Sequence, residues 1–176
     1  MGADDVPALA LEAINRANAD GFTAMLGDVF EGSPWFARRA HRHGPFTSGA
    51  ALIRAMTRVL EEASGEEKLG LIRAHPDLAG KAARARDLEP DSTREQASAG
   101  LDRLSDADFT LFMDLNRRYR EKFGFPFIIA VRDHTLDSII EAFRRRLGSD
   151  PQTEMAEAMA NVGRIVSLRI AERIGE

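Results

Sequence analysis

A half-apolar helical run stops at a proline in the stretch Leu71-Ile72-Arg73-Ala74-His75-Pro76-Asp77-Leu78-Ala79-Gly80. Proline removes a backbone donor and disfavours the α conformation of the residue before it, so the helix is expected to end at His75. The imidazole then lies at a helix end on a stiff backbone, where it can take or give a proton near neutral pH. The simpler interpretation is an ordinary helix stop, in which His75 interacts with the negative end of the helix dipole.

Apolar residues at helical spacing recur on both sides of this stretch. The clearest stripe has the spacing of a helix that buries one face, and it consists of Phe22, Met25, Leu26, Val29 and Phe30. Capping residues and prolines mark the expected helix starts, at Asp5 and Pro7, Asp20, Ser33-Pro34, Thr47 or Ser48, Glu66, Ser92, Ser105, Thr135 and Asp150-Pro151. The sequence therefore predicts an all-α protein, with residues 1–176 forming a single compact domain of about eight or nine helices.

One apolar run lacks helical periodicity, Phe125-Pro126-Phe127-Ile128-Ile129-Ala130-Val131. Its composition is strand-like, but no second strand signal exists elsewhere to pair with it. We interpret it as a short extended and buried segment, or as the first turn of a helix entered from Pro126. Buried backbone groups need partners, so this segment must find them elsewhere in the protein or bind a ligand.

Composition and charge exclude several classes of function. The formal charge of −4 argues against a dedicated nucleic-acid binder. Two arginine clusters, Arg117-Arg118-Arg120 and Arg144-Arg145-Arg146, are interpreted as solvated helix faces. The chain has no cysteine, which excludes disulfides and a cysteine nucleophile. No apolar run reaches the roughly 18 residues of a membrane span, and the acidic start does not resemble a signal peptide, so a cytoplasmic protein is expected.

Three residues stand out from the helical pattern. His75 ends its helix, and Glu95 has the spacing of a capping box with Ser92. Arg169 projects from the apolar face that carries Ile165 on the last helix. Each has a simpler explanation, because Glu95 can cap its own helix and Arg169 can pair with a structural carboxylate. Together they offer a proton-transfer imidazole, a carboxylate to orient it and a cation, beside a helix N-terminus that favours anions. This set predicts a small anionic ligand and acid–base chemistry.

Other candidate residues have simpler interpretations. His41-x-His43 is a possible metal pair, but no carboxylate-rich ligand set accompanies it, so surface histidines and no metal site are predicted. Trp35, the only tryptophan, is expected in the core. Residues 81–91 are polar and predict a surface loop or a short, weakly held helix.

The sequence resembles the 2-oxo-4-hydroxy-4-carboxy-5-ureidoimidazoline (OHCU) decarboxylases between residues 21 and 169. The motifs that carry this resemblance are Ser33-Pro34-Trp35, Gly44-Pro45-Phe46, His75-Pro76-Asp77-Leu78-Ala79-Gly80, Glu95-Gln96-Ala97, Ala99-Gly100-Leu101, Asn116-x-x-Tyr119-x-x-Lys122-Phe123-Gly124-Phe125-Pro126-Phe127 and Leu168-Arg169. Motifs of this length in the same order are a specific signal.

The resemblance implies a carboxy-lyase of urate breakdown, which converts OHCU to (S)-allantoin and CO2 without a cofactor. It implies that His75 and Glu95 are the catalytic residues. The substrate-binding positions that it implies are Pro76, Ser92, Thr93, Arg94, Glu95, Gln96, Phe127, Ile128, Ile129, Ala130, Val131 and Arg169. It also implies a homodimer, since the family commonly forms one.

Two alternatives remain open from the sequence. His75-Pro76-Asp77 also matches the tripeptide of J-domain co-chaperones, but those carry a basic helix before the tripeptide, whereas Glu61-Glu62 and Glu66-Glu67 are acidic. The other alternative is a decarboxylase that acts on a related ureido acid.

Overall fold

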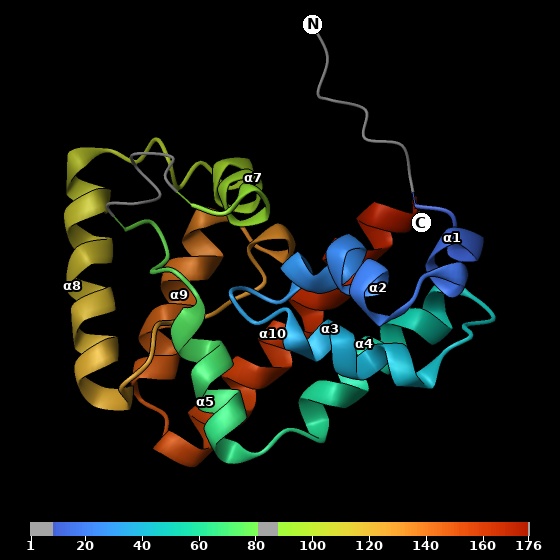
Figure 1. Cartoon of the computed structure of the whole chain (residues 1–176). Coiled ribbons are helices and arrows are strands. Elements are labelled where there is room, and N and C mark those ends of the chain that lie inside the picture. Colours follow the sequence, from blue (N-terminus) through green and yellow to red (C-terminus); the bar gives the residue numbers. More distant parts are fainter. Residues whose placement is uncertain (1–8, 81–87, 176) are drawn as a thin grey trace, which may run out of the picture. The chain divides into compact units, whose positions relative to one another are not determined.

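The fold is all-α, as the sequence predicts. The computed structural model describes residues 9–80 and 88–175, and these ranges contain nine α-helices, three short 3-10 helices and no strand (Figure 1). The expected helix start at Asp5 and Pro7 lies outside the described residues, as do residues 81–87 of the polar stretch 81–91, and the described helix begins at Leu11. The α-helices are α1 (Leu11–Arg16), α2 (Ala19–Leu26), α3 (Trp35–Ala40), α4 (Gly49–Glu61), α5 (Gly65–Ala74), α7 (Pro90–Ser98), α8 (Asp106–Phe123), α9 (Leu136–Leu147) and α10 (Pro151–Ile174). The 3-10 helices are η1 (Gly27–Val29), η2 (His41–His43) and η3 (Val131–Asp133).

The described residues divide into two compact units, so the single domain over residues 1–176 stays a prediction. The first unit comprises residues 9–63 and 166–175, and in it α3 packs against α2 and α4. The predicted stripe on α2 and η1 is largely buried, with Phe22, Leu26, Val29 and Phe30 at most 1% exposed. The core of the first unit consists mainly of apolar residues on one face of each helix, as expected for amphipathic helices.

Two helix starts differ from the prediction. Asn18, rather than Asp20, caps α2, and its side-chain oxygen accepts the Gly21 N–H at 2.8 Å. The helix expected from Glu66 begins at Gly65, and Ser64 is its N-cap residue, which forms a reciprocal capping box with Glu67. In both cases the cap is the residue whose side-chain oxygen reaches a backbone N–H that the first helical turn leaves without a partner.

The prediction that Trp35 lies in the core is wrong. Its side chain is 37% exposed, while the neighbouring Phe36 is fully buried. Successive helical residues point about 100° apart, so Trp35 and Phe36 face different directions, and Phe36 is the one that faces the core. The Trp35 ring instead lies against Phe36, with centroids 3.8 Å apart, and the Arg39 guanidinium stacks over it at 4.6 Å.

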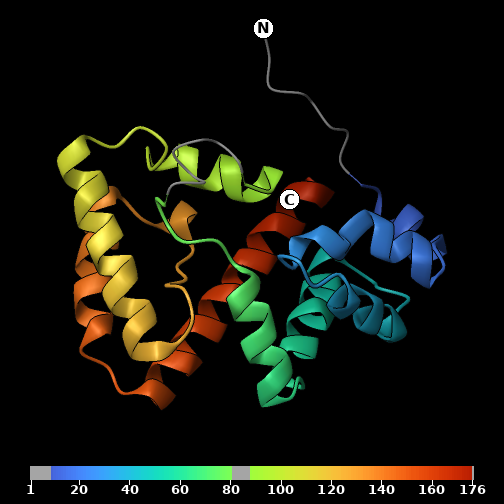
Figure 2. The same ribbon diagram turned by 60° about the vertical axis from the view of Figure 1, so that its left-hand side comes forward.

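The second unit comprises residues 64–80 and 88–165, and its long helices α8 and α9 lie side by side (Figure 2). Aromatic rings from both helices fill the space between them. Phe127 stacks on Phe143 with centroids 3.8 Å apart and an interplanar angle of 11°, and Tyr119 meets both rings edge-on. The extended segment of residues 125–130 therefore runs through an aromatic core, which confirms that it is buried and not helical.

Gly124 ends α8 in the left-handed conformation, with φ of +77°, as expected for a C-cap. A β-carbon there would meet only the flexible end of Arg73, at 3.8 Å, so the penalty for alanine is backbone strain rather than a clash. We expect Gly124→Ala to lower the free energy of unfolding by about 1–2 kcal/mol, measured by urea denaturation. Gly70→Ala, which places a β-carbon in open space within α5, is the control. A Gly124→Ala variant as stable as the wild type would contradict this account of the helix end.

Candidate active site

His75 lies where the sequence predicts a helix stop. It caps the C-terminus of α5 with φ −70° and ψ 141°, an extended conformation that Pro76 favours. The side chain is 8% exposed, and Nδ1 lies 3.0 Å from the Leu71 carbonyl oxygen. A carbonyl oxygen only accepts hydrogen bonds, so Nδ1 carries a proton and Nε2 is the nitrogen whose protonation can change. This contact fixes the orientation of the imidazole, with Nε2 as the nitrogen that can take up or release a proton.

The loop after His75 is attached to two helices of the second unit. The Ala79 N–H donates to Gln96 Oε1 of α7 at 2.8 Å, and Asn116 Nδ2 of α8 donates to the Leu78 carbonyl at 2.8 Å. Ala79 has a φ of +52°, which is strained for a residue with a β-carbon, and its side chain is fully buried. Strain of this kind persists where surrounding contacts fix the backbone, and such positions cluster at functional sites.

The predicted start of α7 at Ser92 is wrong. The helix begins at Pro90, whose fixed φ suits the first helical position, and Ser92 lies buried inside the first turn. Glu89 is the N-cap residue, so Ser92 and Glu95 do not form the N-terminal capping box that their spacing suggests. The helix ends at Ser98. The helix-start amides that favour an anion therefore lie closer to Asp91 than the sequence indicated.

The remaining α7 candidates differ in what they can offer a ligand. Thr93 Oγ1 donates to the Leu88 carbonyl at 3.1 Å, and Arg94 forms an ion pair with Asp91. Gln96 is buried and its Oε1 is engaged by Ala79, so its Nε2 donors are the groups that it can direct to a ligand. Glu95 is half-buried one position earlier on the same helix.

Segment 127–131 also lies in the second unit, and its backbone forms hydrogen bonds with side chains of the protein. The Ile128 carbonyl accepts a hydrogen bond from Arg146 Nη1 at 2.7 Å, and the Ala130 N–H donates to Asn161 Oδ1 at 3.0 Å. The segment continues into η3, which contacts α7. Three of the predicted site elements, namely the loop after His75, α7 and this segment, are therefore linked by direct contacts in the second unit.

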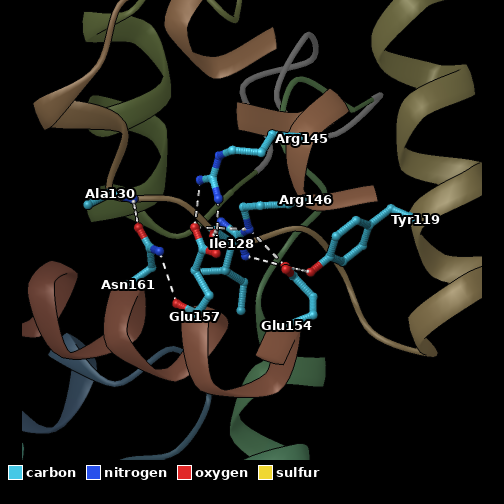
Figure 3. Close-up of polar contacts among 8 residues, drawn as sticks. All are labelled: Tyr119, Ile128, Ala130, Arg145, Arg146, Glu154, Glu157 and Asn161. Atoms are coloured by element: carbon cyan, nitrogen blue, oxygen red, sulfur yellow. Dashed lines mark hydrogen bonds and ion pairs between the residues drawn. The ribbon is translucent and has the colours of Figure 1, made fainter. Parts of the chain in front are cut away.

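A buried ion pair lies behind this segment, and the interpretation of Arg146 as solvated is wrong (Figure 3). Arg146 and Glu154 are both 0% exposed, and Arg146 donates from Nε and Nη2 to Glu154 Oε1 at 2.8 and 2.5 Å. The guanidinium also stacks over the Phe127 ring at 4.3 Å. Tyr119 donates its hydroxyl to the same Glu154 oxygen. Burial, together with that hydrogen bond, raises the pKa of the Tyr119 phenol, so it remains a donor throughout the physiological range.

Arg169 belongs to the first unit, where it pairs with a carboxylate. It is 3% exposed, and Nη1 donates to Glu31 Oε2 at 3.0 Å and to the Val29 carbonyl at 3.3 Å. This pairing is the simpler explanation that the sequence leaves open for the inward-facing arginine. A structural pair and a substrate contact are compatible, because a guanidinium carries five N–H donors.

Four polar residues that contact the candidate site residues or their partners are not identified from the sequence, namely Glu31, Arg146, Glu154 and Asn161. A signal for Arg146 was present, because it lies seven residues after Ile139 and three after Phe143, on the buried face of α9. Glu154 likewise precedes Ala158 by one helical turn, so the spacing of these two buried residues places both on the same face of α10.

His41 is held in place by contacts with other residues of the first unit. Its Nε2 lies 3.0 Å from the Ala17 carbonyl oxygen, and its ring meets Phe22 edge-on. His43 is exposed. Over residues 9–80 and 88–175, none of the helices is long and apolar enough to cross a membrane.

Comparisons with known proteins agree on one family. The family model described as OHCU decarboxylase matches residues 15–171. A relative from Haloferax volcanii, described as a 2-oxo-4-hydroxy-4-carboxy-5-ureidoimidazoline decarboxylase, is 44% identical over 94% of this chain and 96% of its own length. A uric acid degradation bifunctional protein from Bacillus subtilis is 37% identical, covering 94% of this chain and 33% of the relative. A crystal structure described as (S)-allantoin synthase superposes with a TM-score of 0.75 and 26% identity, covering 96% of this chain and 54% of that one.

Proposed function

The chain belongs to the OHCU decarboxylase family of urate degradation, and we propose that it converts OHCU to (S)-allantoin and CO2. The observation that carries the proposal is the buried His75 imidazole, whose Nδ1 is engaged by a backbone carbonyl within the region that the family model matches. The same match includes His75-Pro76-Asp77, which favours the decarboxylase over a chaperone-binding module.

The reaction needs a place for the electron pair that the departing CO2 leaves behind. Cleavage of the bond between the carboxylate and C4 directs that pair into the ring, where the neighbouring C=N bond accepts it and its nitrogen takes up a proton. The resulting enol has a hydroxyl on C4 and a double bond between C4 and C5. Loss of the hydroxyl proton and addition of a proton to C5 then give the C4 carbonyl and the C5 stereocentre of allantoin, which keeps the added ring N–H proton.

In this proposal His75 moves the proton between the C4 hydroxyl and C5 through Nε2. Delivery from one face of the ring sets the S configuration. A positioned acid–base group typically contributes about 10²–10⁴-fold. Glu95 orients or tunes the imidazole, and the Leu71 carbonyl supports it by holding Nδ1 protonated.

The other proposed contacts hold the substrate. Arg169 binds an anionic or carbonyl oxygen, which suits the directional donors of a guanidinium. Pro76, the α7 positions Ser92, Thr93, Arg94, Glu95 and Gln96, and the backbone from Phe127 to Val131 surround the ring and the ureido group. The links between the His75 loop, α7 and segment 127–131 support a shared role for these elements.

We further propose that the enzyme acts as a single domain, forms a homodimer, works in the cytoplasm and needs no cofactor. The conjugated ring of OHCU supplies its own electron sink, which is the chemical reason why none is required. We expect full activity after exhaustive dialysis against a chelator, measured as the initial rate of OHCU consumption. A loss of activity that added divalent metal restores would contradict the cofactor-free proposal.

The direct test uses OHCU generated immediately before the assay. We expect the protein to accelerate both the decay of OHCU absorbance and the release of CO2, one CO2 per OHCU consumed. A protein that leaves OHCU unchanged but releases CO2 from a related ureido acid would instead favour that alternative substrate.

A further inference from the structure

The contacts behind segment 127–131 point to positioning residues that the proposed site had not included. We infer that Arg146 and Asn161 form a two-point clamp, which fixes the backbone of this segment for substrate binding. The inference rests on the proposed function for the identity of the substrate. The clamp itself is defined by two hydrogen bonds, from Arg146 to the Ile128 carbonyl and from the Ala130 N–H to Asn161.

Arg146 is itself held rigidly. Its Nε and Nη2 are engaged by Glu154, so Nη1 is directed at the Ile128 carbonyl, and the guanidinium plane lies over Phe127. Tyr119 fixes the Glu154 carboxylate in turn. Figure 3 shows these side chains converging on the segment from α8, α9 and α10. A buried ion pair adds little net stability compared with apolar packing. The feature that apolar residues could not supply here is the set of directional N–H donors on the Arg146 guanidinium.

Asn161 holds the segment two residues further along. Its Oδ1 accepts the Ala130 N–H, while its own Nδ2 donates to the Glu157 carbonyl one turn earlier in α10. The amide group is thereby oriented by its own helix. Ala130 also accepts the Asp133 N–H at 2.9 Å through its carbonyl, so the backbone there is fixed on both sides of the residue.

The clamp has a consequence for how the segment meets the substrate. The Ile128 carbonyl and the Ala130 N–H are already engaged by protein groups. Substrate hydrogen bonds from this segment therefore fall to its other backbone groups, and the clamp sets where those groups point. A shift of about 1 Å in such a segment is enough to weaken its hydrogen bonds to the bound substrate.

The experiment compares Asn161→Ala and Arg146→Lys with Arg145→Lys as the matched control. A lysine ammonium is a compact charge, which cannot engage Glu154 in a forked contact and also reach Ile128. Arg145 is adjacent in α9, pairs with Glu157 at 2.8 Å and is mostly exposed, so its change leaves the clamp intact. We expect KM for OHCU to rise about tenfold in both clamp variants, the worth of one well-placed hydrogen bond, and to stay unchanged in Arg145→Lys.

The split between KM and kcat separates positioning from mere stability. Loss of stability lowers the fraction of active enzyme, which reduces the apparent kcat and leaves KM unchanged. If the wild type consumes OHCU and KM is unchanged in both clamp variants, the inference is overturned.

A measurement without turnover keeps this result distinct from failure of the proposed function. Amide hydrogen exchange resolved by NMR is expected to be slow at Ala130 in the wild type and at least tenfold faster in Asn161→Ala, with the global unfolding midpoint nearly unchanged. That result would support the clamp even if the wild type did not consume OHCU. Unchanged exchange at Ala130 would overturn it.

Discussion

Replacing His75 with asparagine is expected to lower kcat/KM for OHCU by about 10²–10⁴-fold, while the protein stays folded. The asparagine amide can occupy the position of Nδ1 and donate to the Leu71 carbonyl, as Nδ1 does at 3.0 Å in the wild type. The variant therefore keeps the contact that orients the side chain but has no equivalent of Nε2. A loss of activity in it would arise from proton transfer rather than from the helix end.

His75→Gln complements that variant, since its amide reaches the position of Nε2 but cannot exchange a proton near neutral pH. His43→Asn, at an exposed histidine of the first unit, is the control and should retain full activity. The measurements are initial rates with freshly generated OHCU and urea unfolding of each variant. Wild-type rates and unchanged product configuration in both His75 variants would remove His75 from the mechanism.

Replacing Glu31 with leucine should lower the free energy of unfolding by about 3–5 kcal/mol, the typical cost of removing one partner from a buried ion pair. Glu31 and Arg169 are 4% and 3% exposed, so Arg169 would lose a carboxylate that water cannot readily replace. Asp28→Asn is the matched control, because Asp28 pairs with Arg173 at an exposed position. That change should cost about 1 kcal/mol or less in urea unfolding.

The double variant Glu31→Leu with Arg169→Met separates the two roles of the arginine. Apolar residues that replace a buried ion pair often restore stability, so the double variant should unfold close to the wild-type midpoint. It should nevertheless bind (S)-allantoin at least tenfold more weakly in isothermal titration calorimetry, because the guanidinium is absent. Wild-type affinity in a stable double variant would assign Arg169 a structural role only.

Local rules account for most of the helical architecture. Ser48, Ser105 and Thr135 cap helices as predicted, and Gly124 ends α8. Such caps depend on residues only three positions apart, so the sequence alone contains the required information. The predicted start of α7 is wrong because two local signals compete there, and Pro90 at the first helical position prevails over the spacing of Ser92 and Glu95.

The candidate site was only partly predictable, for a different reason. His75 and Arg169 violate the pattern of their own helices, and that local violation is visible in the sequence. The partners of segment 127–131 come from α9 and α10, 18 and 31 residues away, so nothing near the segment identifies them. Arg146 was misassigned because it sits beside two exposed arginines, although its spacing from Phe143 places it on the buried face.

The configuration of the allantoin that the wild-type protein forms tests the central claim most directly. Freshly generated OHCU is mixed with enzyme, and circular dichroism is followed together with total allantoin. Proton delivery by water has no facial preference, so the uncatalysed reaction gives a product without optical activity. The proposed mechanism predicts that optically active (S)-allantoin accumulates in proportion to enzyme concentration. Racemic allantoin formed at the rate seen in buffer would contradict it.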